Sequence, residues 1–453
     1  MRSEHRHRSI NNKLILMIVL AASALLVTII IVIYLYVSGY FYQKKPIPLS
    51  VALVSEDTKS ALSEAPFQAE AILKRTEELL SESQKTEPFI VSWYMLPGSV
   101  LTMKPAASDY IITRDQVDLL KVYIAMDKKE KASVLMEAID EKLVDTDGYL
   151  LSAIPVSVLT EKQIASIPEL EIKDIRFSSS YFDTLLYTQA LIAYYEKWGS
   201  EDGFRQLEEY SKLLYSEQSL VPPAFKIPAP TPTPIPQQFL ADNPSVIEQD
   251  GDKQDVYEYI PLSSLYLSTL QSLSAIDSRY SGKYEQAKKM IQDAVISDTV
   301  PLYATAYDPE QGGYLYVSDR ESSFHLVPVL ETCLHLAEVD KLPDSTLLWL
   351  KERLLNQQIL YEKYDVIFGE ATSDQEAYEA YAIAIAISVW QNDAALCRAS
   401  INAQANHLAT NTNSQVKDAL FRTVQTNRIS LYARENLLLI LALTTETKNE
   451  DKS

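Results

Sequence analysis

The sequence predicts an all-α fold in which one transmembrane helix precedes a ring of six helical hairpins. Apolar residues recur at spacings of three and four, as at Leu119, Val122, Tyr123 and Met126, which is typical of helices with one buried face. The expected helices alternate between short and long connections, which favours hairpins packed side by side. An open solenoid is the alternative, but no repeat of fixed period is present.

The first expected element is the membrane helix over residues 14–36, which reads LILMIVLAASALLVTIIIVIYLY. No charge lies between Lys13 and Lys44, and the run is long enough to cross the hydrocarbon core. The basic residues before it favour a cytoplasmic tail over 1–13, so that the rest of the chain lies outside the cell. A signal peptide is the alternative, although its apolar core is usually shorter.

A juxtamembrane linker is expected over 37–66, followed by one extracellular domain over 67–445 and a polar tail over 446–453. Residues 221–254 form a proline-rich insertion, which we interpret as a disordered excursion, with a peptide-recognition or wall-contacting arm as the alternative. Eleven helices are expected in the domain, near residues 67–84, 114–143, 181–197, 203–217, 257–276, 282–297, 325–340, 344–358, 375–391, 393–409 and 430–445.

Composition excludes several classes of function. The net charge is −20, and residues 1–45 hold six basic residues and one acidic one, so the rest of the chain has a balance of −25 and repels nucleic-acid phosphates. The chain has only 10 glycines and no phosphate-binding glycine motif. Neither the two cysteines, Cys333 and Cys397, nor the three histidines beyond the membrane segment have metal-ligand spacing. We therefore expect no metal and no cofactor; whether the cysteines form a disulfide stays open.

Several segments resemble family 8 glycoside hydrolases and their six-hairpin relatives, in particular a membrane-associated branch found beside exopolysaccharide synthases in Gram-positive bacteria. These segments are SSSYFDTLLYTQALIAYYEKWG from Ser178, YIPLSSLY from Tyr259, the Gly313-Tyr314 pair, EAYEAYAI from Glu376 and SLYARENLLLILAL from Ser430. The resemblance spans roughly 67–445 and implies an (α/α)6 toroid. It also implies hydrolysis of β-linked polysaccharides with inversion.

The resemblance also shows that the acidic positions are altered. Where the family has its general acid, this chain reads Thr113-Arg114-Asp115-Gln116, so that an arginine replaces the glutamate or Asp115 serves one residue later. The next inner helix keeps one carboxylate, Asp183, and the third acidic position falls near Ser263 with none. Hydrolysis by inversion needs a protonated and an ionised carboxyl group.

Asp183 and Asp115 are the candidate catalytic residues. Tyr110, Arg114, Tyr181, Tyr259 and Glu376 are the candidate substrate-binding residues, because tyrosine offers a flat apolar face with a polar tip. Each carboxylate also has a structural alternative: Thr113-x-x-Gln116, Ser180-x-x-Asp183 and Ser373-x-x-Glu376 match helix-capping patterns. A helix N-terminus would hold Asp183 ionised.

Three functions stay open at this point. The chain is a membrane-anchored extracellular hydrolase of an exopolysaccharide or cell-wall glycan, a toroid that binds such a glycan without cleaving it, or a helical scaffold in a polysaccharide export assembly. The expected partners are a polysaccharide or oligosaccharide, the membrane through residues 14–36, and proteins of exopolysaccharide synthesis. The expected location is the cell membrane, with a single span.

Overall fold

The computed structural model describes residues 20–23, 25–31, 44–96, 104–160, 179–217, 219–221, 259–309, 311–316, 322–424 and 428–449. Residues 20–23 and 25–31 are helical, and the rest of the predicted membrane span falls outside the described residues. Within the described part of the chain, no helix combines the length and apolarity needed to cross a membrane. The proline-rich insertion predicted over 221–254 lies outside the described residues except for Val221.

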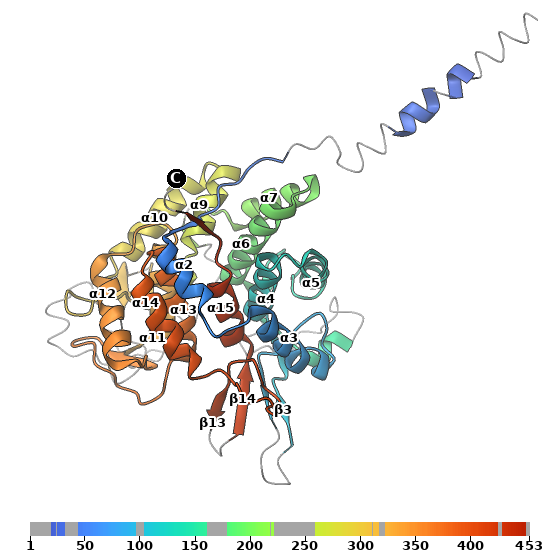
Figure 1. Cartoon of the computed structure of the whole chain (residues 1–453). Helices are drawn as coiled ribbons and strands as arrows, with labels where there is room; N and C mark the ends of the chain where they lie inside the picture. The colour runs from blue at the N-terminus through green and yellow to red at the C-terminus, as the bar shows by residue number, and fades with distance from the viewer. Residues whose placement is uncertain are drawn as a thin grey trace, which may run out of the picture.

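Six helices in the described residues form a closed inner ring (Figure 1). They are α4 (Thr113–Ala125), α6 (Tyr181–Trp198), α9 (Leu267–Ile276), α11 (Leu326–Ala337), α13 (Tyr378–Trp390) and α15 (Ala433–Leu443). Each of them contacts the next in this order, and α15 contacts α4. The inner helices are buried on nearly every side, and α13 buries Ala380, Tyr381, Ala382, Ile383, Ala384 and Ile385 consecutively. The predicted (α/α)6 toroid is therefore confirmed.

The outer helices cover this ring with one face each. They are α3 (Ala69–Leu80), α5 (Lys129–Lys142), α7 (Glu201–Leu214), α10 (Tyr280–Gln292), α12 (Asp344–Glu352) and α14 (Ala394–Ala405). The helix predicted over 114–143 is in fact the hairpin of α4 and α5, with a turn at Asp127, whose φ of 60° ends the first helix. Because α4 and α5 were predicted as one helix, only eleven of the twelve helices of the six hairpins were expected. The helix predicted from 257 begins only at Leu267.

The prediction of a purely helical domain is wrong in one respect, because extended segments lead into most inner helices. They pair into small sheets, of which the largest has the order β13-β14-β2-β3 and projects from the helical body (Figure 1). The strands are β2 (Trp93–Met95), β3 (Ala106–Ala107), β4 (Tyr110–Ile112), β5 (Leu150–Leu151), β6 (Ala153–Pro155), β7 (Ser179–Ser180), β8 (Ile260–Pro261), β9 (Ala306–Asp308), β10 (Gly313–Leu315), β11 (Ser323–His325), β12 (Lys363–Asp365), β13 (Arg422–Val424) and β14 (Arg428–Tyr432). Runs this short carry no periodicity that a sequence could reveal.

The segment expected to be a linker up to residue 66 is folded onto the ring from residue 44. We call residues 44–63 the strap. It contains β1 (Ala52–Val54) and α2 (Glu56–Ser63), and α2 packs on α14. Strand β1 pairs in parallel with β15 (Thr447–Asn449), so the first residues of the expected polar tail are also part of the fold.

Hydrogen bonds fix the strap at the C-terminal end of the inner helices. The backbone N–H of Lys45 donates to the Tyr195 hydroxyl (2.9 Å), and the Ser272 hydroxyl donates to the Pro48 carbonyl (2.8 Å). The Asn392 Oδ1 accepts from the N–H of Ser55 (2.7 Å). One hydrophobic core then runs from the strap through all the inner helices. Cys333 and Cys397 are buried free thiols within it.

Candidate functional site

The N-terminal ends of the inner helices lie on one face of the ring, next to the sheet β13-β14-β2-β3. The inner helices α4, α6, α11 and α15 begin directly after a strand, so their first turns face this end. Two of the predicted residues, Arg114 and Asp183, sit in the first turns of α4 and α6. Polar side chains from α11, α13 and α15 converge on the same place.

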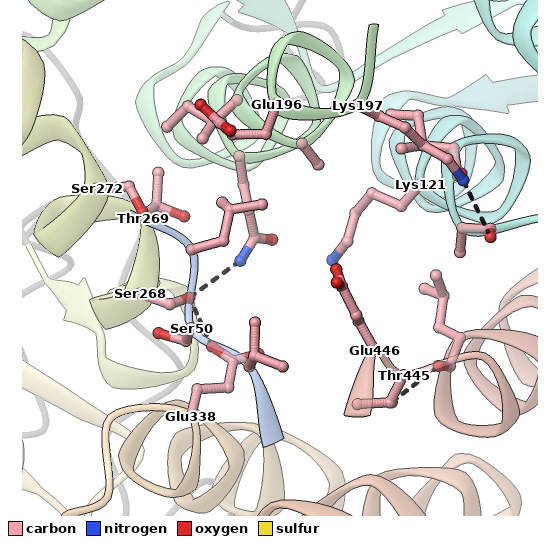
Figure 2. A pocket seen from close by; sticks show the side chains of 18 of the residues that line it. Ser50, Lys121, Glu196, Lys197, Ser268, Thr269, Ser272, Glu338, Thr445 and Glu446 are labelled. Carbon is pink, nitrogen blue, oxygen red and sulfur yellow. Dashed lines mark hydrogen bonds between the residues drawn. The ribbon is translucent and has the colours of Figure 1, made fainter. Parts of the chain in front are cut away.

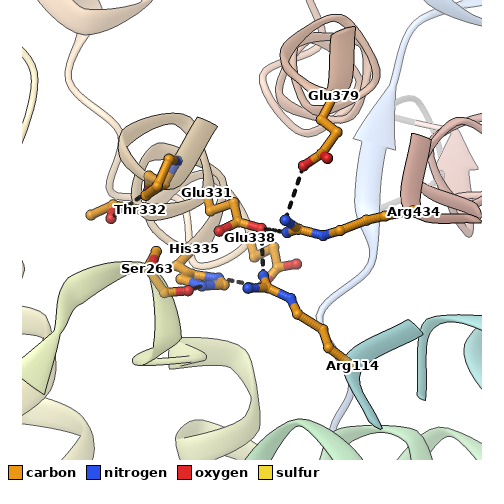
Figure 3. Close-up of polar contacts among 9 residues, drawn as sticks. Arg114, Ser263, Glu331, Thr332, His335, Glu338, Glu379 and Arg434 are labelled. Atoms are coloured by element: carbon orange, nitrogen blue, oxygen red, sulfur yellow. Dashed lines mark hydrogen bonds and ion pairs between the residues drawn. The ribbon is translucent and has the colours of Figure 1, made fainter. Parts of the chain in front are cut away.

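Four of these side chains form a continuous chain of ion pairs, shown in Figure 3. We call Arg114, Glu331, Glu379 and Arg434 the central network. Arg114 and Arg434 both pair with the carboxylate of Glu331, and Arg434 also donates to Glu379 at 2.9 Å. The members come from four different inner helices, which adds electrostatic contacts across the ring.

The central network determines the protonation of Glu331. Burial alone would raise the pKa of this carboxyl group, but the guanidinium groups of Arg114 and Arg434 outweigh it and lower the pKa. The Glu331 side chain is 8% exposed, whereas those of Arg114 and Arg434 are 27% and 20% exposed. Both arginines can therefore reach a ligand while Glu331 holds them in place.

Asp115 lies on α4 beside the central network and is almost fully buried, at 4% exposure. Burial is the main cause that raises the pKa of its carboxyl group to about 7, and the neighbouring Asp118 adds to the shift. Arg434 opposes it. A carboxyl group that keeps its proton near neutral pH is the type that general acid catalysis uses. Its burial separates it from solvent.

Asp183 is half-buried at the N-terminus of α6, where the Ser180 hydroxyl accepts its backbone N–H at 3.1 Å. The capping pattern predicted for this pair is thus confirmed. Burial raises the pKa of the Asp183 carboxyl group, despite the opposing effects of Ser180, Arg114 and Ser152. This direction differs from the lowered pKa expected from a helix N-terminus, because desolvation outweighs the dipole.

A second group of residues adjoins the central network through Glu379. The Arg422 guanidinium lies between the rings of Tyr378 and Tyr432, 4.6 and 4.7 Å from their centroids. Arg422 pairs with Glu435, whose pKa burial raises to about 8, and lies 4.0 Å from Glu379. Both tyrosines are half-buried.

Glu376 lies outside the helix that it was expected to cap, because α13 begins at Tyr378. Its carboxylate pairs with His407 at 2.8 Å, and the His407 ring packs against Tyr378 with centroids 4.6 Å apart. Burial lowers the pKa of His407, while Glu376 opposes this shift. Glu376 therefore lies next to the group around Arg422, on the same side of the ring.

The predicted tyrosines have different places. Tyr181 is 2% exposed, with its ring edge-on to Phe182, and Tyr259 is 3% exposed beside Ala306. Neither ring can stack on a sugar in this conformation, because both rings are buried. Tyr110 is half-buried in β4. Tyr378 and Tyr432 are likewise half-buried.

The capping pattern expected at α4 is absent. The Thr113 hydroxyl donates to the Leu151 carbonyl, and Gln116 donates to the Ile90 carbonyl at 2.9 Å and accepts its N–H at 3.0 Å. Sequence reasoning also missed Glu331, Glu379, Arg422 and Arg434. A signal was present, since Glu379 and Arg434 fall inside the segments EAYEAYAI and SLYARE that carry the family resemblance.

Comparison with known proteins confirms the fold. An α-amylase from Clostridium perfringens superposes with a TM-score of 0.63 at 18% identity, over 83% of this chain and 96% of that one. A cold-adapted family 8 xylanase gives 0.52 at 9% identity, over 88% and 96%. PssZ from Listeria monocytogenes gives 0.50 at 11% identity, over 88% and 98%. No protein-family model and no curated protein sequence matches the chain. The chain thus has the six-hairpin fold of the family 8-like glycosidases.

Proposed function

We propose that this protein binds a polysaccharide or oligosaccharide at the N-terminal end of its inner helices and does not cleave it. The observation that carries the proposal is the central network, in which arginines neutralise Glu331 and Glu379. Fixed charged groups that are partly exposed give strong hydrogen bonds to sugar hydroxyls. They do not supply the pair of unengaged carboxyl groups that inversion requires.

The surroundings of the central network fit a sugar. The half-buried Tyr378 and Tyr432 lie beside it with Arg422 over both rings, and Asp183 offers a hydrogen-bond acceptor near Arg114. Two proteins of the same fold are named as an α-amylase and a xylanase. The substrate class of this fold therefore supports a carbohydrate ligand.

Hydrolysis is the second candidate function, and Asp115 is the observation that favours it. Its pKa of about 7 would allow it to act as a proton donor near neutral pH, with Asp183 as the second carboxyl group. This function requires Asp115 to become accessible to the ligand, since it is 4% exposed in the structure.

We propose further that residues 14–36 anchor the protein in the cell membrane, with the domain outside and proteins of exopolysaccharide synthesis as partners. The support is the uncharged run in the sequence, together with the position of the strap. The strap joins the ring at the C-terminal end of the inner helices. An anchored domain would thus present the central network away from the membrane.

The test uses the full-length purified protein with cellohexaose, xylohexaose and maltohexaose. Calorimetry measures binding, and chromatography of the sugars after long incubation measures cleavage. We expect at least one hexasaccharide to bind and none to be shortened. Asp183→Asn should weaken binding by about 1–3 kcal/mol if a charge-assisted hydrogen bond is lost.

Asp202→Asn is the matched control, because Asp202 is exposed on α7 and pairs with the nearby Arg205. It should bind as the wild type does. Shortened sugars that disappear in Asp115→Asn would establish hydrolysis instead. If Asp183→Asn and the wild type bind every hexasaccharide equally, the ligand does not occupy this end of the ring.

A further inference from the structure

A pocket of about 830 Å³ lies between the strap and the inner helices, bordered by the last residues of α4, α13 and α15 and by the start of α9. Its volume lies in the range of small-molecule sites, roughly 300–1,000 Å³. Four inner helices, α4, α6, α9 and α15, contribute Lys121, Gln189, Thr269 and Leu441 to its wall, respectively. Trp390 at the end of α13 also lines the pocket. The pocket shares no lining residue with the central network.

Two charged residues of the wall are already engaged. Glu196 accepts the backbone N–H of Ile47 at 2.6 Å and pairs with Lys44 at 3.0 Å, which fixes the strap. Lys197 donates to the Ile124 carbonyl at the end of α4, at 2.6 Å. These side chains hold the pocket together, so their charges are not available to a ligand.

The other charged residues of the wall balance one another. They are Lys121, Lys448, Glu338 and Glu446, two of each sign. Figure 2 shows Lys121 and Glu446 pointing toward one another across the pocket. The wall therefore gives no net electrostatic preference, and it suits an uncharged polar ligand better than an anion or a cation.

The wall also holds polar atoms that lack a protein partner among the described residues. Thr269 is 1% exposed, and its hydroxyl oxygen makes no hydrogen bond. The Gln189 amide donates to the Ser268 hydroxyl at 3.2 Å, but its carbonyl oxygen accepts none. Ser268 in turn donates to Glu338 at 2.7 Å (Figure 2), which orients the amide. Buried polar atoms normally have partners, and neither of these two has accessible surface in this conformation, so each would bond a ligand in the pocket after a rotation of its side chain.

We infer that this pocket is a second saccharide-binding site, which takes an uncharged sugar unit or a short neutral oligosaccharide. Sugar hydroxyls both donate and accept, so one ligand can satisfy Thr269 and Gln189 together. The apolar part of the wall, including Trp390, can cover a sugar face. The inference does not depend on the site at the central network, none of whose four residues lines the pocket.

The test measures the number of ligands bound per full-length protein, with cellohexaose, xylohexaose and maltohexaose as probes. Thr269→Val and Gln189→Leu remove the two polar atoms with little change in volume, and Ala193→Phe fills the pocket. We expect one ligand in the pocket, and two per wild-type chain when the site at the central network is also occupied. Thr269→Val and Gln189→Leu should each weaken one of the two binding events about two- to tenfold. Ala193→Phe should abolish that event.

Thr188→Val is the matched control, because Thr188 is buried on α6 and its hydroxyl donates to the Thr184 carbonyl at 2.8 Å, outside the pocket. It should leave both binding events unchanged. Binding that responds to the pocket variants but not to Asp183→Asn supports the pocket and refutes the proposed function. Binding that responds only to Asp183→Asn, or the failure of all three probes to bind, overturns the pocket.

Discussion

The two ends of the toroid use the same inner helices in opposite ways. At the N-terminal end, charged side chains from four helices meet in the central network and fill the middle of the ring. Toward the strap, the inner helices and the strap together line an open pocket. The first end is held by ion pairs within the ring and the second by a segment from outside it.

This difference predicts that removal of a charged group costs more stability in the central network than around the pocket. Glu331 is 8% exposed and binds two arginines, so the removal of its charge leaves both of them without their main partner. Around the pocket, the open space allows water to solvate a changed side chain. The ends should therefore respond differently to mutation, which three experiments can measure.

The largest effect is expected for Glu331→Gln. Loss of this carboxylate leaves Arg114 and Arg434 paired with fewer acids in a largely buried place, which should lower the free energy of unfolding by about 3–5 kcal/mol. Chemical denaturation measures it. Glu285→Gln is the control, because Glu285 also forms an ion pair, with Lys288, but its side chain is 62% exposed. This variant should change stability by less than about 1 kcal/mol. Equal effects of the two variants would contradict the assigned role of the network.

The second effect concerns pH and Asp115. The folded chain holds this proton up to about pH 7, whereas the unfolded chain releases it near 3.8. Because the folded pKa is raised, stability falls as pH rises from about 4 to 7. Asp115→Asn removes this loss and should stabilise the protein at pH 8 by on the order of 2–4 kcal/mol, with little change at pH 4.

Denaturation curves of wild type and Asp115→Asn at both pH values check this expectation. Asp202→Asn, at an exposed position on α7, should show no such dependence on pH. If the difference in free energy of unfolding between Asp115→Asn and wild type is the same at pH 4 and pH 8, Asp115 ionises normally.

The smallest of the three effects is expected at the strap. Asn392 has a φ of 52°, which glycine adopts freely, and its carbonyl oxygen accepts from Ser55 and Thr58. Asn392→Gly removes the acceptor and should cost about 1–2 kcal/mol. Hydrogen exchange should become faster in residues 52–63 and stay unchanged in α4 and α15. Uniformly faster exchange throughout the ring would show that the strap is not an independent unit.

Much of the architecture could be predicted from the sequence. The spacing of apolar residues located the long helices, and the alternation of short and long connections indicated hairpins, because both are local properties of the chain. Asp127 was the exception: its left-handed conformation divides α4 from α5, although the helical pattern continues through it. The strap was predicted as a linker because its burial depends on α6, α9 and α14, which are distant in the chain.

By itself, the sequence determined the helical ring and placed Arg114 and Asp183 at the starts of neighbouring inner helices, since helix boundaries follow from local pattern and capping residues. The tertiary structure decided what these residues do. Glu331 pairs with Arg114, which is 217 positions away in the sequence, and Arg434 pairs with the same carboxylate. Burial, which only packing can fix, raised the pKa of Asp183 and Asp115 and turned Tyr181 and Tyr259 inward. Desolvation depends on every neighbour of a group, and no local stretch of sequence contains that information.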